Sequence, residues 1–427
     1  MTGDGGLIRV PAPVNAHSHA FHRILRGRTH AAAVPGTGLA GTGGSGRSTS
    51  GAGDFWVWRE QMYDAAAALT PEEYEKLATA VFAEMVVTGF SAVGEFHYLH
   101  HRPGGQPYPG HDMERALARA AVAAGIRLTL LDTCYLSGGL DSRGARLPLN
   151  DTQRRFSDRD ADGWITRWES LVAALAEEDG GSGLVTLGAA FHSLRAVPEE
   201  ALEPLAAWAR EHPEEPLHIH LSEQPAENTA VEAAYGTSPT GLLARHGLLG
   251  PRLSAVHATH LSPEDIRLLG EHGVTVVMCP TTEADLADGI GPARELADAG
   301  AVIALGTDQH AVVDPYLEMR ALEHGERLRS GTRGRFSPDE IGAAARAGGL
   351  RSLGLPENDD HILVGTGSLR TAGSRPEQLP LTATAADVVS VVINGTEVAR
   401  DGVHTRLGPP AELYREVLSS GGAASGI

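Results

Sequence analysis

Apolar and polar positions follow two alternating patterns along the chain. Short runs of apolar and β-branched residues end in polar residues, which is typical of buried strands. Alanine-rich segments with apolar residues at helical spacing follow most of these runs. The runs predict strands over residues 7–14, 91–96, 126–134, 184–191, 217–221, 254–257, 274–278 and 302–306. The segments between them predict helices, among them 71–88, 112–124, 198–211, 263–272 and 315–328.

Eight short strands with helices between them favour a closed α/β barrel of the (β/α)8, TIM-like type. A doubly wound open sheet is the competing architecture. Near the C-terminus, two β-rich runs within 387–403 flank Asn394-Gly395, which is a hairpin signal. We therefore expect a barrel over residues 1–385 and a small β appendage with a tail over 386–427. The Gly- and Ser-rich segment 31–53 is predicted to be a mobile loop.

Composition narrows the class of protein. The 427 residues are 42% hydrophobic and 21% charged, which is typical of a globular chain. A formal charge of −19 argues against nucleic acid or an anionic membrane as the main partner. The chain does not start with a basic segment followed by an apolar one, and it has no apolar run of membrane-spanning length. We therefore expect a cytoplasmic protein.

Polar residues with metal-binding chemistry gather at the ends of four predicted strands. His17 and His19 end the first strand, and their i, i+2 spacing places both on one side of it. His220 ends the fifth strand, and Asp308 follows the eighth. In a barrel, the carboxyl ends of all strands meet at one mouth, where the active site lies. These four residues are the predicted metal ligands.

Two further strand-end positions suit proton transfer. Glu223 lies three residues after His220, within reach of a group bound at the metal. The sixth strand ends near His257 and His260, of which one is expected to serve catalysis and the other to be structural.

The ligand set favours a single zinc or similar divalent ion. Three imidazoles and one carboxylate leave a coordination position open for a water molecule. The only cysteines, Cys134 and Cys279, exclude a cysteine-built zinc site and a disulfide scaffold. The single lysine, Lys76, lies in a predicted helix, which argues against a lysine-bridged pair of metals. One metal with Glu223 as proton shuttle is the arrangement of a deaminase.

These motifs resemble the deaminase branch of the amidohydrolase superfamily. Longer strings resemble the formimidoylglutamate deiminases of that branch, from about residue 14 to 324: NAHSHAFHR, FWVWREQMY, GEFHYLHH, FHSLRAV, HIHLSEQ, VHATHLS, CPTTEADLADGI and LGTDQH. The resemblance implies that His17, His19, His220 and Asp308 bind zinc. It implies that Glu223 and His257, together with Asp308, handle protons.

The resemblance also implies a substrate. Members of this family hydrolyse N-formimidoyl-L-glutamate to N-formyl-L-glutamate and ammonia in histidine degradation. Their substrate pocket maps onto Arg59, Tyr98, His192 and Arg195, and arginines suit a substrate with two carboxylates. His22 stands where the family has glutamine, so we expect a pH-dependent contact there. A homodimer is implied as well.

Two other functions stay open at this point. One is a related deaminase acting on another amidine, a guanidine or a nucleobase. The other is a catalytically silent binding protein on a barrel scaffold. The family also has a longer segment before its first strand, so an appendage reduced at its N-terminal side or a misassigned start is expected.

Overall fold

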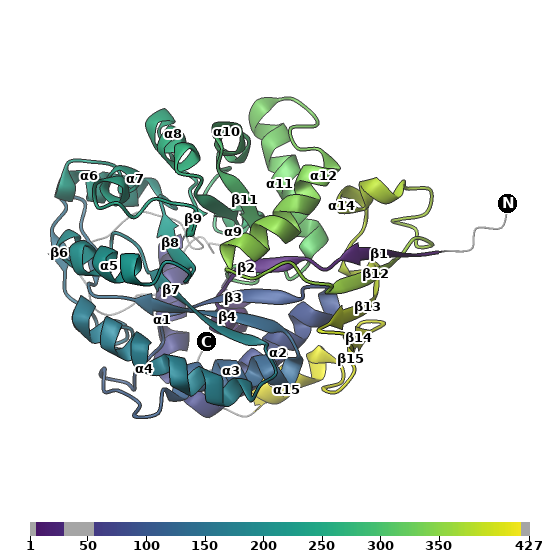
Figure 1. Ribbon diagram of the computed structural model, residues 1–427, viewed down its shortest axis with the longest axis horizontal. Coiled ribbons are helices and arrows are strands. Elements are labelled where there is room, and N and C mark those ends of the chain that lie inside the picture. Colours follow the sequence, from purple (N-terminus) through teal and green to yellow (C-terminus); the bar gives the residue numbers. More distant parts are fainter. Residues whose placement is uncertain (1–5, 30–54, 420–427) are drawn as a thin grey trace, which may run out of the picture.

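Eight parallel strands form the central sheet of the computed structural model, which describes residues 6–29 and 55–419 (Figure 1). Their spatial order is β11-β10-β9-β8-β7-β4-β3-β2. The strands are β2 (Val14–Ser18), β3 (Ala92–His97), β4 (Arg127–Cys134), β7 (Val185–Phe191), β8 (Leu217–Leu221), β9 (Leu253–His257), β10 (Thr275–Met278) and β11 (Val302–Leu305). The predicted loop 31–53 and the end of the predicted tail lie outside the described residues.

The two ends of this sheet meet. Ser18, at the end of β2, forms a parallel bridge with Asp308, just after β11. The backbone N–H groups of Thr307 and Asp308 both donate to the His17 carbonyl, at 3.1 and 3.0 Å. Gly306 permits this approach, because a Cβ there would lie 2.8 Å from the His17 Cβ. The contact closes the barrel, as predicted, and the open-sheet alternative was wrong.

Helices cover the outside of the barrel, with capped starts that match the predicted pattern. Pro71 and Pro263 lie in the first turns of their helices, after Thr70 and Ser262, which form capping boxes with Glu73 and Asp265. The main covering helices are α2 (Pro71–Thr88), α3 (Asp112–Ala124), α4 (Ala161–Asp179), α5 (Glu199–Glu211), α6 (Pro225–Tyr235), α7 (Pro239–Arg245), α8 (Pro263–Glu271), α10 (Ala293–Ala299) and α11 (Pro315–Ser330). Among the described helices, none is both long and apolar enough to cross a membrane.

Several shorter strands and helices complete the fold. Two short strands, β5 (Gly139–Leu140) and β6 (Arg146–Leu147), pair beside α6. The other helices are α1 (Phe55–Ala68), α9 (Pro280–Asp285), α12 (Pro338–Ala343), α13 (Gly349–Ser352), α14 (Leu379–Thr382) and α15 (Pro410–Ser419). Of these, α1 and α9 matter for the site.

The first predicted strand, 7–14, was wrong as one element. The chain forms β1 (Leu7–Pro11) and then the barrel strand β2 (Val14–Ser18). Pro11 and Pro13 lack an N–H donor, so a continuous strand cannot keep its hydrogen bonds through this segment. The break lets β1 leave the barrel and pair antiparallel with β12 (His361–Gly365).

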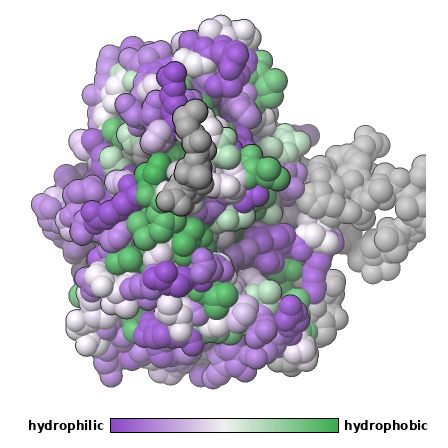
Figure 2. Space-filling view, turned by 90° about the vertical axis from the view of Figure 1, so that its right-hand side faces the viewer, coloured by the Kyte–Doolittle hydropathy of each residue, from purple (hydrophilic) through white to green (hydrophobic). Residues whose placement is uncertain are grey.

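The β appendage is an antiparallel sheet in the order β1-β12-β13-β14-β15. The predicted hairpin is confirmed: β13 (Val388–Ile393) and β14 (Thr396–Arg400) flank Asn394 and Gly395, both with positive φ, and β15 (Val403–His404) follows. The sheet also contains β1 and β12, so its strands come from both sides of residue 385, the predicted end of the barrel. Figure 2 views the molecule from this side and shows apolar residues gathered near the centre of the face.

A buried ion-pair network fastens α3 and α4 to the barrel strand β4. The Arg167 guanidinium donates to Asp132 at 2.7 and 2.9 Å and to Asp158 at 2.8 and 2.9 Å. It also reaches Glu114, at 3.3 Å, which contacts His100 Nδ1 at 2.8 Å. Burial and Arg167 lower the pKa of His100, but the neighbouring carboxylates outweigh them and raise it. Arg167 is therefore the central cation of this buried network, in contact with all three carboxylates.

The network predicts a large stability effect. Arg167→Leu leaves Asp132 and Asp158 buried without their counter-ion, so we expect it to lower the free energy of unfolding by about 3–5 kcal/mol. Urea unfolding of the variant measures this loss. Arg267→Leu is the control, because Arg267 pairs with Glu264 and Glu271 at the surface, where ion pairs contribute little. Equal stability of the two variants would contradict this account of the network.

Candidate active site

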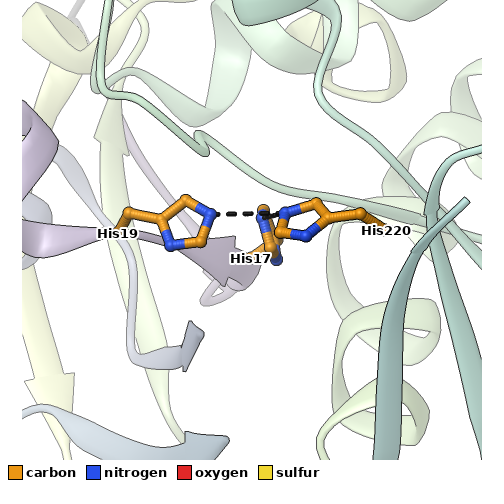
Figure 3. Close-up of side chains that lie close together, drawn as sticks. All are labelled: His17, His19 and His220. Carbon is orange, nitrogen blue, oxygen red and sulfur yellow. Dashed lines mark hydrogen bonds between the residues drawn. The ribbon is translucent and has the colours of Figure 1, made fainter. Parts of the chain in front are cut away.

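Three histidines converge at the carboxyl-terminal mouth of the barrel. His17 lies in β2, His19 follows that strand directly, and His220 lies in β8 on the opposite wall (Figure 3). Nε2 of His220 lies 3.2 Å from Nε2 of His17 and 3.4 Å from Nε2 of His19. Oδ1 of Asp308 lies 3.5 and 3.4 Å from the same atoms of His17 and His19. The structure thus brings all four predicted metal ligands together.

The contacts of Nδ1 in His19 and His220 determine whether Nε2 of each ring carries a proton or a lone pair. Nδ1 of His19 lies 2.8 Å from the Phe96 carbonyl, and Nδ1 of His220 lies 3.0 Å from the His192 carbonyl. A carbonyl only accepts, so both Nδ1 atoms carry the proton. Burial lowers the pKa of His19 to about 3 and that of His220 well below its usual value, so both rings are neutral. Their Nε2 atoms therefore face each other with lone pairs.

Lone pairs at this distance call for a cation between them. In a tetrahedral zinc site with bonds of 2.0–2.1 Å, ligand atoms lie about 3.3 Å apart. The observed separations of 3.2, 3.4, 3.4 and 3.5 Å match this spacing. The outward N–H to carbonyl contacts are those that orient metal-binding histidines in general. The residues present therefore fit one divalent ion such as zinc.

Neighbouring polar residues hold the ligand-bearing segments in place. Asn15 donates to the Thr307 hydroxyl at 2.8 Å and accepts from the Thr307 N–H at 3.0 Å, linking β2 to the end of β11. Ser18 donates to Glu95 at 2.5 Å, and the Ala20 N–H donates to the same carboxyl at 2.6 Å. Burial raises the pKa of Glu95 to about 8. These contacts tie the loop after β2, which carries His19, to β3.

His257 and Glu223 lie beside the ligand cluster. Nε2 of His257 is 3.9 Å from a Glu223 carboxylate oxygen and 3.9 Å from Asp308. Burial lowers the pKa of His257, but Glu223, Glu283 and Asp308 together raise it to about 10. His260 lies elsewhere, with Nε2 contacting the Asp288 carbonyl at 2.8 Å. Of the two histidines after β9, His257 is thus the one that faces the site.

A cavity of about 500 Å³ opens onto this cluster. All five residues expected to bind substrate line it: His22, Arg59, Tyr98, His192 and Arg195. His22 and Tyr98 are buried, and His22 Nε2 lies 3.0 Å from the Tyr98 hydroxyl. The cavity is therefore continuous from the metal-ligating residues to the two arginines.

The two arginines approach the cavity from different elements. Arg59 comes from α1, and its guanidinium lies 5.3 Å from the centre of the Tyr63 ring. Arg195 follows β7 and lies 3.3 Å from Glu223 and 3.7 Å from Glu227. Arg195 and the predicted proton shuttle Glu223 therefore both line the cavity, in contact with each other.

Several cavity residues escaped the sequence reasoning. Tyr63, Tyr135 and Glu227 line the wall, and Gln153 donates to both tyrosine hydroxyls, at 3.1 and 2.8 Å. No ligand-like spacing marks these residues, because they come from separate helices and loops. Glu283 was also missed as a functional residue, although it lies in the quoted string CPTTEADLADGI, and Oε1 of its carboxylate lies 3.4 Å from His257 Nδ1.

Comparison with known proteins agrees with this geometry. Residues 8–366 match the Amidohydrolase family. The chain is 36% identical to formimidoylglutamate deiminase of Pseudomonas aeruginosa, over 82% of this chain and 73% of that protein. It is 28% identical to 8-oxoguanine deaminase of the same species, over 98% and 88%. A crystal structure of an amidohydrolase from Brucella melitensis superposes with a TM-score of 0.83, at 29% identity, covering 97% and 89% of the two chains.

Barrel, ligand cluster and cavity together define a metal-dependent hydrolase of the (β/α)8 class. The chain belongs to the Amidohydrolase family. Its relatives in that family include deaminases. Of the two described above, formimidoylglutamate deiminase has the higher identity to this chain.

The ligand geometry predicts how the metal is lost. His19→Ala and His220→Ala each remove one of the facing nitrogens, so we expect purified variants to hold less than about a tenth of the wild-type metal, measured by elemental analysis. His260→Ala is the matched control, because its ring contacts a backbone carbonyl outside the cluster. Full metal content in both ligand variants would show that the ion binds elsewhere.

Proposed function

We propose that the protein hydrolyses N-formimidoyl-L-glutamate to N-formyl-L-glutamate and ammonia, with one zinc ion per chain, as a step of histidine degradation. The observation that carries the proposal is the placement of Arg59 and Arg195 on the wall of the cavity that leads to the ligand cluster. The identity to formimidoylglutamate deiminase of Pseudomonas aeruginosa supports it. No other part of the described cavity offers two permanent cations for a dicarboxylate.

The cavity residues suit the two ends of this substrate. Arginine binds a carboxylate through two parallel hydrogen bonds, and Arg59 and Arg195 each present a guanidinium. The Tyr98 hydroxyl and His22 lie close together and add donors at the same wall. Binding at these residues directs the formimino group toward the metal-ligating residues, so remote contacts position the reacting carbon.

The residues of the chain then divide the proton transfers. His17, His19, His220 and Asp308 would hold a divalent ion, which when bound would supply Lewis-acid activation of a water molecule. Asp308 belongs to the ligand cluster and His257 lies 3.9 Å from it, so the two side chains are placed to orient the attacking water toward the formimino carbon. Glu223 carries a proton to the leaving nitrogen. A carbon–oxygen bond forms, the carbon–nitrogen bond to the terminal nitrogen breaks, and ammonia leaves.

A nucleobase deaminase is the second candidate. The aromatic residues Trp58, Tyr63, Tyr98 and Tyr135 line the same cavity, and aromatic faces stack on bases. The identity to 8-oxoguanine deaminase also favours it. Two arginines on the wall suit an anionic substrate better than a neutral base, which is why the formimidoyl amino acid is the first choice.

Ammonia release distinguishes the two candidates. Zinc-loaded protein is assayed with N-formimidoyl-L-glutamate, N-formimidoyl-L-aspartate, guanine and 8-oxoguanine. We expect kcat/KM for the glutamate derivative to exceed the others by at least about 100-fold, because two correctly spaced carboxylate contacts are lost or misplaced in each competitor. Selective release from either purine would favour the nucleobase deaminase instead.

Glu223→Gln tests the proton shuttle. The amide keeps the size of the side chain but cannot carry a proton, so we expect kcat to fall by about 100- to 10,000-fold while metal content stays at the wild-type value. Steady-state kinetics and elemental analysis of the same preparation measure both quantities. A variant that turns over at the wild-type rate would remove Glu223 from the mechanism.

Arg59→Met tests carboxylate recognition. The variant keeps an unbranched apolar side chain and loses the charge, so we expect KM for N-formimidoyl-L-glutamate to rise about 10- to 100-fold. Arg102→Met is the control, because Arg102 stacks on Tyr108 and does not line this cavity. An unchanged KM in Arg59→Met would place the substrate carboxylates elsewhere.

A further inference from the structure

His257 lies in an unusual backbone conformation. It ends β9 with φ 68°, and Ala258 follows with φ 50°, both in the left-handed region that is costly for residues other than glycine. The side chain is almost fully buried, at 1% exposure. The position of the protons on its ring therefore depends on the groups near the two ring nitrogens.

One of those groups is Glu283, in the first turn of α9. Its carboxylate oxygen Oε1 lies 3.4 Å from Nδ1 of His257. The same oxygen accepts the Cys279 N–H at 2.9 Å, and the Glu283 N–H donates to the Cys279 carbonyl at 2.9 Å. The residue is 4% exposed. Glu283 is thus fixed at both its backbone and its side chain, and it presents an immobile acceptor to the ring.

We propose that Glu283 is a positioning residue that keeps the proton of His257 on Nδ1. A carboxylate that faces a ring nitrogen accepts a hydrogen bond, so Nδ1 must carry the hydrogen. Nε2 is then the nitrogen presented to Glu223 and Asp308, each 3.9 Å away. The ring thus keeps Nε2 toward the reacting groups, while Glu283 holds the hydrogen on Nδ1. The inference rests on the proposed function only in assigning His257 to the hydrolytic step.

The arrangement parallels the logic of a catalytic triad, in which a buried carboxylate holds a histidine in one tautomer. Here Glu283 comes from a helix that follows β10, whereas His257 ends β9. A change at residue 283 therefore acts on His257 without removing a metal ligand or a group that lines the cavity.

The chain offers a matched control that contacts the same helix from another element. Glu318 of α11 accepts the Thr281 N–H at 3.1 Å and the Thr281 hydroxyl, so it too anchors the start of α9. It is 1% exposed, as deeply buried as Glu283. If Glu283 merely stabilised α9, then Glu318→Leu and Glu283→Leu would have similar effects.

Nitrogen NMR of the zinc-loaded protein with ¹⁵N-labelled histidines tests the proposal. The His257 signals are assigned by their loss in His257→Gln. We expect Nδ1–H in the wild type, in Glu318→Leu and in Glu283→Gln, whose amide oxygen keeps an acceptor. In Glu283→Leu we expect the ring to shift to the Nε2–H tautomer or to a mixture.

Kinetics provide the second measurement. We expect Glu283→Leu to lower kcat about 10- to 100-fold, because a displaced proton on His257 removes part of a general acid–base contribution, with KM within about twofold of the wild type. Glu283→Gln is expected to recover most of this loss. If Glu283→Leu keeps the Nδ1–H signal, the proposal is overturned. If no protein releases ammonia from N-formimidoyl-L-glutamate, the proposed function fails, whereas the NMR result still decides the role of Glu283.

Discussion

The facing imidazole nitrogens of His17, His19 and His220 are the arrangement on which the rest of the site depends. The neutral rings of His19 and His220 direct their Nδ1 protons at backbone carbonyls, which leaves their Nε2 lone pairs 3.4 Å apart in a buried place. Such an arrangement repels itself unless a cation lies between the nitrogens. The seam that closes the barrel, from Ser18 and His17 to Thr307 and Asp308, runs through two of the metal-ligating residues. Metal binding and barrel closure are therefore expected to support each other.

The charges around the cluster follow from the same constraint. Three carboxylates approach His257: those of Asp308, Glu223 and Glu283. Asp288 lies nearby, and burial together with the charge of Glu223 raises the pKa of Asp288 to about 8. Few cations oppose these carboxylates. Arg195 contacts Glu223 and Glu227, and a divalent ion would supply the remaining positive charge. An anionic substrate that binds at Arg195 would compete with Glu223 for the guanidinium, which links substrate recognition to the residue that carries the proton.

The sequence predicted most of the fold because hydrophobic periodicity and capping residues are local signals. Two of the named helices match their predicted ranges, 71–88 and 112–124, and seven barrel strands lie within a residue or two of theirs. The prediction failed at 7–14, where an unbroken apolar pattern hides the change of sheet at Pro11 and Pro13. It also missed β12, which pairs with β13 on one side and on the other with β1, near the opposite end of the chain.

Some residues of the site could likewise be predicted from the sequence, and others could not. Metal ligands could be predicted because histidine and aspartate at strand ends converge in any barrel. Arg59, Tyr98, His192 and Arg195 came from resemblance, and the structure places them on one cavity. Glu283 lies in one of the strings that carry the resemblance, but its contact with His257 depends on packing between separate elements, as do the contacts of Gln153 with two tyrosines. The Arg167 network was missed for the same reason, since its members come from α3, α4 and β4.

X-ray absorption at the zinc edge tests the central claim, that one divalent ion is held by these rings. The account predicts one zinc ion per chain, with about three imidazole nitrogens and one or two oxygens at 2.0–2.2 Å. The spectrum of His260→Ala should be the same, and that of His19→Ala should lose imidazole scattering if any zinc remains. A spectrum with sulfur ligands, or with a second metal about 3.5 Å away, would contradict the account.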